Sequence, residues 1–186
     1  TEATAWQYRF FVPHDVNGMI QLFGGKEEFV AALDDIFNTD AEIHGNLVDI
    51  TGLIGQYVHG NEPSHHIAYL YNYVGEPWKT QKMSRRLLNE MYHPTPEGII
   101  GNEDCGQMSA WYILSSMGLY SVCPGSNEYV LTTPLFEKVV VHLANGRTLT
   151  ILANDPQKNI YITKVELNGK QIDTNFITYD CLMGGG

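Results

Sequence analysis

Two neighbouring carboxylates stand just before an apolar run in GNEDCGQMSAWYILSSMGLY, residues 101–120. They are Glu103 and Asp104, and an acid in this place can serve either a helix or a reaction. Asn102 or Asp104 can cap the helix by accepting its free N–H groups, while Glu103 suits the positive end of the helix dipole. An acid held at the mouth of a buried helix can also act as a general base. Spacing alone favours capping.

A further acid, Glu2, lies among aromatic residues in TEATAWQYRFFVPHD. A lone glutamate near a chain end is ordinarily a solvated acid. The aromatic neighbours, Trp6 among them, allow a second interpretation, because aromatic rings stack on the C–H faces of sugars. An apolar wall also raises the pKa of a carboxyl group toward general-acid duty.

The segment VHGNEPSHH gathers five polar side chains, namely His59, Asn61, Glu62, His65 and His66. The consecutive His65 and His66 point about 100° apart on a helix, so they do not form the i, i+4 pair of a zinc helix. Backbone carbonyls with the side chains of Asn61 and Glu62 are hard oxygen donors that suit calcium. Asn61 can equally be a plain turn residue, and the histidines can be hydrogen-bonded core residues.

Up to about residue 120, apolar residues recur at the spacing of an α-helix. We therefore expect helices to position these candidate residues. Residues 27–40 form one amphipathic pattern, and a second helix is expected from Pro63 to Gly75. A third helix follows Pro77, and the tight Gly-Glu-Pro link predicts that the second and third pack as an antiparallel pair.

The helix after Gly106 is apolar on nearly every side, so we expect it to be buried on most of its surface, with Gly118 as its C-cap. Beyond Gly125 the pattern becomes β. KVVVHL and TLTIL flank Ala-Asn-Gly-Arg, and Asn168-Gly169 predicts a second hairpin. We therefore predict a mainly α fold with a β tail, in which residues 1–120 are helical and residues 121–186 are antiparallel β.

Composition excludes several classes of protein. The 186 residues carry a formal net charge of −10 with only 11 Lys and Arg, which argues against a nucleic-acid partner. No apolar stretch approaches the roughly 20 residues that span a bilayer, and the N-terminus lacks an export signal. The chain begins without Met and ends at LMGGG, so we expect a piece of a longer precursor. The three cysteines form no CxxC pair, which predicts buried free thiols.

Read in order, TEATAWQY, HGNEPSHHIAYLYNYVGEPWKTQ, GNEDCGQMSAWYILSSMGLYSVCPGS and ELNG resemble glycoside hydrolase family 92, the calcium-dependent exo-acting α-mannosidases. The two middle motifs are long and specific, and the resemblance covers essentially the whole chain. It implies the C-terminal part of a catalytic region, with helices of an (α/α)6 barrel (α-toroid) followed by strands. It also implies inverting hydrolysis of a terminal α-mannoside, often α-1,2-linked, in N-glycans or mannans.

The resemblance implies a role for each candidate residue. Glu2, in a motif with Ala3 where the family has Gly, would be the general acid, and Asp104 would be the general base. Asn102 stands where some members carry another Asp, so it would help Asp104 to hold the attacking water. Inversion requires two carboxyl groups roughly 6.5 to 9.5 Å apart, with water between one of them and the sugar.

The resemblance further implies that calcium is held around Gly60 and Asn61, where it binds the 2- and 3-hydroxyls of mannose. The side chains expected around the sugar are Trp6, His59, Glu62, His65 and His66, with Glu103 in support. A mannose-containing substrate implies a secreted or periplasmic bacterial enzyme, without nucleic-acid or membrane partners and of open oligomeric state. Two alternatives remain, a non-catalytic carbohydrate-binding or scaffold module of the same fold and an α-toroid glycosidase acting on glucosides.

Overall fold

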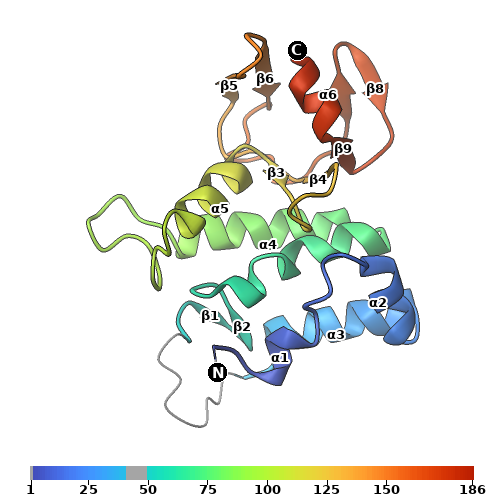
Figure 1. Cartoon of the computed structure of the whole chain (residues 1–186), viewed down its shortest axis with the longest axis vertical. Coiled ribbons are helices and arrows are strands. Elements are labelled where there is room, and N and C mark those ends of the chain that lie inside the picture. Colours follow the sequence, from blue (N-terminus) through green and yellow to red (C-terminus); the bar gives the residue numbers. More distant parts are fainter. Residues whose placement is uncertain (1, 41–49) are drawn as a thin grey trace.

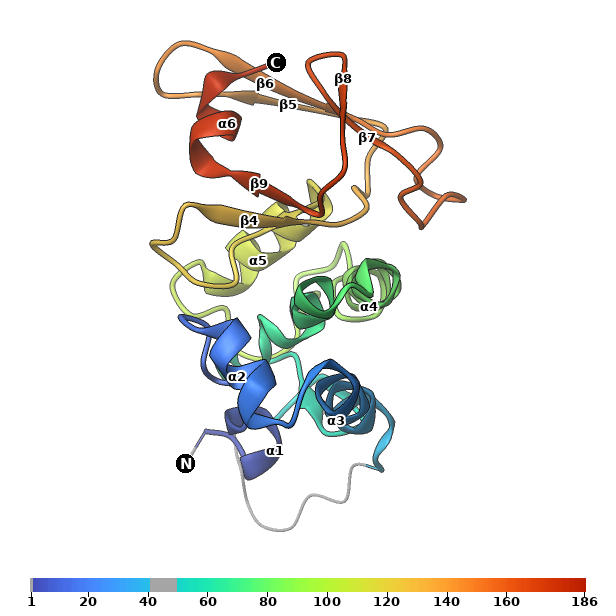
Figure 2. The same cartoon turned by 90° about the vertical axis from the view of Figure 1, so that its right-hand side faces the viewer.

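The computed structural model describes residues 2–40 and 50–186. Figures 1 and 2 show most of the helices together at the end that holds the N-terminus, and the strands that follow residue 118, with one short helix, at the end that holds the C-terminus. The helical elements are α1 (Ala5–Tyr8), α2 (Val16–Leu22), α3 (Lys26–Asn38), η1 (Glu62–Ser64), η2 (Ile67–Val74), α4 (Pro77–Glu90) and α5 (Gln107–Ser116). A short antiparallel hairpin, β1 (Leu53–Ile54) and β2 (Tyr57–Val58), leads directly into the HGNEP turn.

The helix pair predicted around Gly75 is present, but its first member is a 3₁₀-helix in two pieces, η1 and η2, rather than one α-helix. Gly75 ends η2 in the left-handed conformation, with φ +84°. Pro77 occupies the first turn of α4, where its missing N–H removes no helical hydrogen bond. The two helices pack on each other along their lengths.

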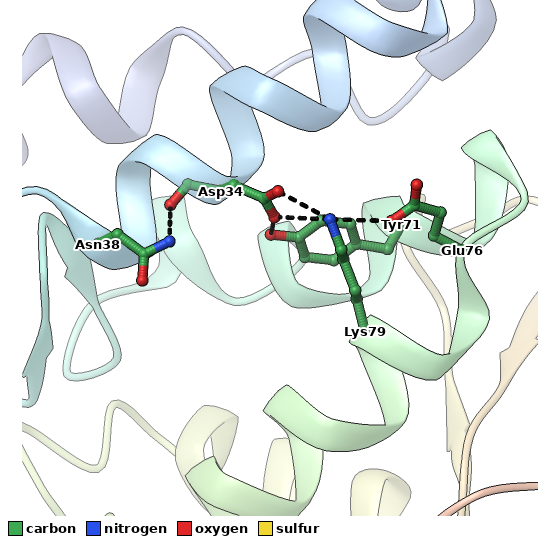
Figure 3. A network of polar contacts seen from close by, with 5 residues as sticks. All are labelled: Asp34, Asn38, Tyr71, Glu76 and Lys79. Atoms are coloured by element: carbon green, nitrogen blue, oxygen red, sulfur yellow. Dashed lines mark hydrogen bonds and ion pairs between the residues drawn. The ribbon is translucent and has the colours of Figure 1, made fainter.

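A polar network joins α3 to this pair (Figure 3). The Asp34 carboxylate accepts from the Lys79 ammonium at 2.7 Å and from the Tyr71 hydroxyl at 2.9 Å. Lys79 also pairs with Glu76 at 2.9 Å. Because Asp34 lies on α3 while its partners lie on η2 and the start of α4, the contacts fix the crossing of three helices.

The core lies mostly in the helical part, around fully buried side chains such as Phe29, Leu33, Tyr69 and Trp111. Apolar spacing in residues 27–40 predicted the face that α3 buries, and Phe29, Leu33 and Ile36 are indeed inaccessible. No helix within residues 2–40 and 50–186 has the length and apolar character needed to cross a bilayer.

The strands after residue 118 are antiparallel, as predicted, and we call residues 119–186 the β region. Its elements are β3 (Leu119–Tyr120), β4 (Glu128–Leu131), β5 (Lys138–His142), β6 (Thr148–Leu152), β7 (Val165–Leu167), β8 (Lys170–Ile172), β9 (Phe176–Thr178) and a short helix α6 (Tyr179–Gly184). β5 pairs with β6, and β7 pairs with β8. Asn168 and Gly169 have φ of +48° and +77°, the positive values that a two-residue hairpin turn requires.

Two sequence-based expectations are wrong. α5 is not buried on most sides, because Ile113 is 55 % exposed and Ala110 also faces solvent, while Trp111 and Met108 lie in the core. The sequence did not predict which side of α5 is buried, because its apolar residues are nearly continuous. The cysteines are free thiols but are not buried, since Cys105 and Cys181 are exposed and Cys123 is half-buried.

Candidate active site

The N-terminal segment is tied to the HGNEP turn by two amide side chains. Gln7, buried on α1, accepts from the backbone N–H of Thr4 at 2.7 Å and donates through Nε2 to the carbonyl of Gln56. Asn61 donates through Nδ2 to the carbonyl of Glu2 at 2.7 Å. Glu2 lies near the start of the sequence, but its backbone is held in place by a hydrogen bond to a turn 59 residues away.

Glu2 itself is exposed, and Trp6 is half-buried against the core. The guanidinium of Arg9 lies over the Trp6 ring, 4.5 Å from its centroid. One face of Trp6 is thus already engaged in a cation–π contact.

Two glycines allow the segment before α5 to lie directly on the HGNEP turn. Gly60 donates to the Thr51 carbonyl at 3.1 Å, and a Cβ on Gly60 would collide with Thr51 Oγ1. A Cβ on Gly101, whose φ is +74°, would lie 2.6 Å from the Gly60 carbonyl oxygen. Side chains at either position would push the two segments apart, so glycine is required for their contact.

The backbone that carries Asp104 adopts an unusual conformation. Asp104, Cys105 and Gly106 have successive φ values of +52°, +54° and +99°. Positive φ is uncommon for residues with a Cβ, and such strain concentrates at functional sites. Asp104 is exposed, so the turn presents an acid to solvent at the start of α5.

Glu103, rather than Asn102 or Asp104, caps α5. Its carboxylate accepts from the Gly106 N–H at 2.6 Å and from Ser109 Oγ at 2.7 Å. The Ser109 hydroxyl and the Gly106 N–H lower the pKa of Glu103, because they stabilise its charged form. The capping role predicted for Asn102 or Asp104 is wrong, and Asp104 is left available for chemistry.

His59 lies in the interior, with both ring nitrogens engaged. Nδ1 is 2.8 Å from the hydroxyl of Tyr57, and Nε2 is 2.8 Å from the hydroxyl of Tyr92. Its ring packs edge-to-face on Trp111, and burial lowers its pKa to about 3, so it is neutral. With no accessible ring nitrogen, His59 cannot bind a sugar directly in this conformation, contrary to its predicted role.

His65 and His66 are also buried and hydrogen-bonded. His65 Nε2 donates to the His59 carbonyl at 2.9 Å, and its Nδ1 accepts from Gln107 Nε2 at 3.1 Å. His66 Nε2 donates to the carbonyl of Phe10 at 2.7 Å. The alternative of hydrogen-bonded core histidines therefore describes both residues better than sugar contact does.

Burial lowers the pKa of His65 to about 4 and also lowers that of His66. The charge of Asp104 acts on His65 in the opposite direction, because a nearby anion favours the imidazolium form. Asp104 therefore lies within electrostatic reach of the buried His65.

The oxygens at the HGNEP turn are of the kind that calcium prefers. Asn61 lies at the start of η1, and its Oδ1 accepts from the Glu62 N–H at 3.1 Å while keeping a second lone pair. Glu62 is only half-buried. The hydroxyl oxygen of Thr51, packed beneath Gly60, is a buried polar atom without a hydrogen-bond partner among the described residues.

Within residues 2–40 and 50–186, no three His, Cys, Asp or Glu side chains are grouped as metal ligands. The Gly60 carbonyl and the Asn61 amide oxygen nevertheless fit a hard cation, for which neutral oxygens are suitable ligands. Two such oxygens fall short of the six to eight that calcium takes, so water, substrate hydroxyls or other protein groups must complete the shell.

Three segments thus meet at one place, namely the backbone of Glu2, the Gly60–Asn61 turn and the loop that carries Asp104. In Figure 1 the N-terminus, the β1–β2 hairpin and the chain between α4 and α5 lie along the same side of the helical part. Sequence analysis missed Gln107, Tyr92 and Thr51, which touch this arrangement. Gln107 lies within the recognised GNEDCGQ motif. Its role could not be predicted, because an amide side chain at the start of a helix can make many kinds of hydrogen bond.

A family model described as "Glycosyl hydrolase family 92 catalytic domain" matches residues 1–186. The chain belongs to glycoside hydrolase family 92. In structure it is similar to the family 92 α-mannosidase BT3965 of Bacteroides thetaiotaomicron, solved with mannoimidazole, at a TM-score of 0.94 and 43 % identity. The inverting mannosidase BT2199 of the same species gives a TM-score of 0.85 at 39 % identity.

A curated relative, an uncharacterized secreted glycosidase of Arthroderma benhamiae, is 33 % identical over 189 residues. All three comparisons cover the whole of this chain, but only 24 % of BT3965, 27 % of BT2199 and 22 % of the fungal protein. The chain thus spans about a quarter of the length of these family 92 relatives. The helices and antiparallel strands of this part of the family fold are as predicted.

Proposed function

We propose that this chain contributes the acid, the base and the sugar-orienting turn to a family 92 α-mannosidase that removes terminal α-linked mannose with inversion. The proposal rests chiefly on one observation, the contact of both acid-bearing segments with the Gly60–Asn61 turn. It takes residues 1–120 as helices of an (α/α)6 barrel and residues 121–186 as the strands that follow. Residue 1 and residues 41–49 lie outside the described part.

The two carboxyl groups have distinct tasks in this reaction. Glu2 protonates the glycosidic oxygen as the leaving group departs, and Asp104 takes a proton from the water that attacks the anomeric carbon from the opposite face. Asn102 helps to orient that water. Glu103 neutralises the start of α5, so Asp104 is free to act as a base.

The remaining residues bind or position the sugar. Glu62 and the free side of Trp6 contact its hydroxyls and ring, while His59, His65 and His66 support the turn from inside the protein. Calcium, bound at the Gly60 carbonyl and Asn61 Oδ1, would polarise the mannose hydroxyls and favour ring distortion toward the transition state. α-1,2-Linked mannose in N-glycans or mannans is the proposed substrate. An extracellular or periplasmic location is consistent with the secreted fungal relative.

The test uses a chimaeric enzyme in which these 186 residues replace the matching quarter of BT3965. The chimaera should release mannose from α-1,2-mannobiose and should bind mannoimidazole in calorimetry. Binding without hydrolysis would instead support the carbohydrate-binding module. Release of glucose from α-glucosides in place of mannose would support the glucosidase. A chimaera that unfolds cooperatively yet neither binds nor hydrolyses would overturn the proposal.

Removing calcium tests the proposed metal. EGTA should lower the activity of the chimaera by about a hundredfold or more, since metal stabilisation of the transition state amounts to several kcal/mol. Added calcium should restore it. Asn61→Ala should weaken calcium binding in calorimetry, whereas Asn159→Ala in the β region should not. Undiminished activity in EGTA would remove calcium from the mechanism.

A further inference from the structure

The start of α5 is connected to the HGNEP turn by buried hydrogen bonds that the proposed reaction does not use. Gln107, the first residue of α5, meets His65 at 3.1 Å, and His65 meets the His59 carbonyl at 2.9 Å. The Gln107 backbone N–H also donates to the Asp104 carbonyl at 3.1 Å. The path from Asp104 to the carbonyl beside Gly60 therefore passes through two side chains.

The direction of each hydrogen bond in this path is fixed. A carbonyl oxygen only accepts, so His65 Nε2 must carry the proton and its Nδ1 must accept. Gln107 can satisfy Nδ1 only with its amide nitrogen. His65 is 2 % exposed, so surrounding side chains hinder its ring from turning to another partner, and the Trp111 indole fixes its backbone by donating to its carbonyl at 3.1 Å.

A second connection runs parallel to the first. His59 Nε2 meets the hydroxyl of Tyr92, which in turn lies 3.4 Å from the carbonyl of Met108 on α5. The first two residues of α5 are thus each joined to a histidine of VHGNEPSHH. The Tyr92 contact is longer, which makes the His65 connection the tighter of the two.

We propose that His65 and Gln107 are positioning residues, whose hydrogen bond holds the Asp104 turn at its working distance from the Gly60–Asn61 turn. The inference rests on the proposed function, because it assigns these residues to the same site. In the proposed reaction, Asp104 must reach a water that attacks a sugar held at the turn, so its rate depends on that distance. A displacement of about 1 Å can lower a rate by about a hundredfold. Substrate binding at the turn itself does not depend on it.

The experiment separates the two hydrogen bonds of His65 in the chimaera. His65→Gln keeps a donor for the His59 carbonyl, and His65→Asn keeps an acceptor for Gln107, so neither preserves the whole connection. Gln107→Glu replaces the donor with an acceptor. Each variant should lower kcat by about ten- to a hundredfold with KM changed by less than about twofold. Gln157→Glu, the same change on an exposed side chain of the β region, should leave both constants unchanged.

Two further measurements exclude a merely structural role. The double variant His65→Asn with Gln107→Ala should lose no more activity than the more impaired of its two single variants, because all three break the same connection. In the 186-residue chain, the imidazole nitrogen shifts of His65 should show a protonated Nε2, and Gln107→Glu should change them.

The outcomes distinguish the inference from the function on which it rests. An inactive parent chimaera would overturn the proposed function and this inference together. An active chimaera in which Gln107→Glu leaves kcat unchanged, or raises KM as much as it lowers kcat, would overturn the inference alone. A protonated Nδ1 on His65 would also overturn it.

Discussion

Around the Gly60–Asn61 turn, several buried polar side chains make hydrogen bonds to the backbone or to other side chains, whereas the β region carries an open groove lined mainly by aliphatic side chains. Gln7, His59, His65 and His66 are all at most 4 % exposed, and each has a hydrogen-bond partner. The groove measures about 910 Å³ and is lined by residues such as Leu149, Ile151, Leu167, Ile172 and Leu182. Neither Glu2 nor Asp104 lines this groove, although it is large.

The difference reflects what each surface can do. An unpaired polar group is costly to bury, so the hydrogen bonds of these buried side chains hold their positions, although the Thr51 hydroxyl beneath Gly60 lacks a partner among the described residues. Glycoside hydrolysis requires a pair of carboxyl groups, whereas the lining of the groove is mainly aliphatic and includes the single carboxylate of Glu166. The proposed sugar chemistry therefore belongs to the turn rather than to the groove.

The largest expected effect concerns Asp104. Asp104→Asn in the chimaera keeps the shape of the strained turn but removes the proton acceptor, so kcat on α-1,2-mannobiose should fall by about 10²–10⁴-fold. Asp173→Asn, the same substitution on an exposed loop of the β region, should change kcat by less than about twofold. A loss under about tenfold for Asp104→Asn would remove this residue as the base and weaken the contrast between the regions.

The buried histidines predict a pH dependence of stability. Their pKa values are lowered to about 3 for His59 and about 4 for His65, so the unfolded chain binds protons near pH 6 that the folded chain does not. Stability is therefore full above about pH 6.5 and falls with acidification, by about 2 kcal/mol for each histidine between pH 7 and pH 5.

Urea unfolding of the 186-residue chain at the two pH values measures this loss. A glutamine side chain cannot take up a proton, so His65→Gln should lose part of the pH dependence while His59 and His66 keep the rest. A free energy of unfolding that is the same at pH 7 and pH 5 would mean that the histidines are not held neutral in the fold.

The elements themselves were largely predictable. Helical spacing located α3 and α4, and Asn168-Gly169 located the β7–β8 hairpin, because these signals depend on neighbours in sequence. The one-sided burial of α5 was not predictable, since it depends on which surfaces the rest of the fold covers. The sequence placed the helix cap among Asn102, Glu103 and Asp104 but did not single out Glu103, because each of these adjacent polar residues satisfies the spacing.

The site was predictable only in part. The motifs identified the turn and the acids. The sequence could not show that the ring nitrogens of His59 and His65 are hydrogen-bonded to Tyr57, Tyr92 and Gln107. Those partners lie up to 42 residues away, and only packing decides whether a histidine faces a sugar or the core.

The smallest expected effect concerns the groove. Leu149→Ala should lower the free energy of unfolding by about 1 kcal/mol, less than a fully buried leucine would lose, because this side chain is only partly buried. The kcat of the chimaera should stay within about twofold of the parent. A fall in kcat at unchanged stability would show that the groove takes part in the reaction.

The central claim is that Glu2 and Asp104 act as acid and base, and leaving-group dependence tests it most directly. An activated 2,4-dinitrophenyl α-mannoside needs no protonation of its leaving group, whereas mannobiose does. We predict that Glu2→Gln lowers the kcat/KM of the chimaera on mannobiose by about 10²–10⁴-fold but by less than about tenfold on the activated substrate. Asp104→Asn should be impaired equally on both. A Glu2→Gln variant impaired equally on both substrates would contradict the claim.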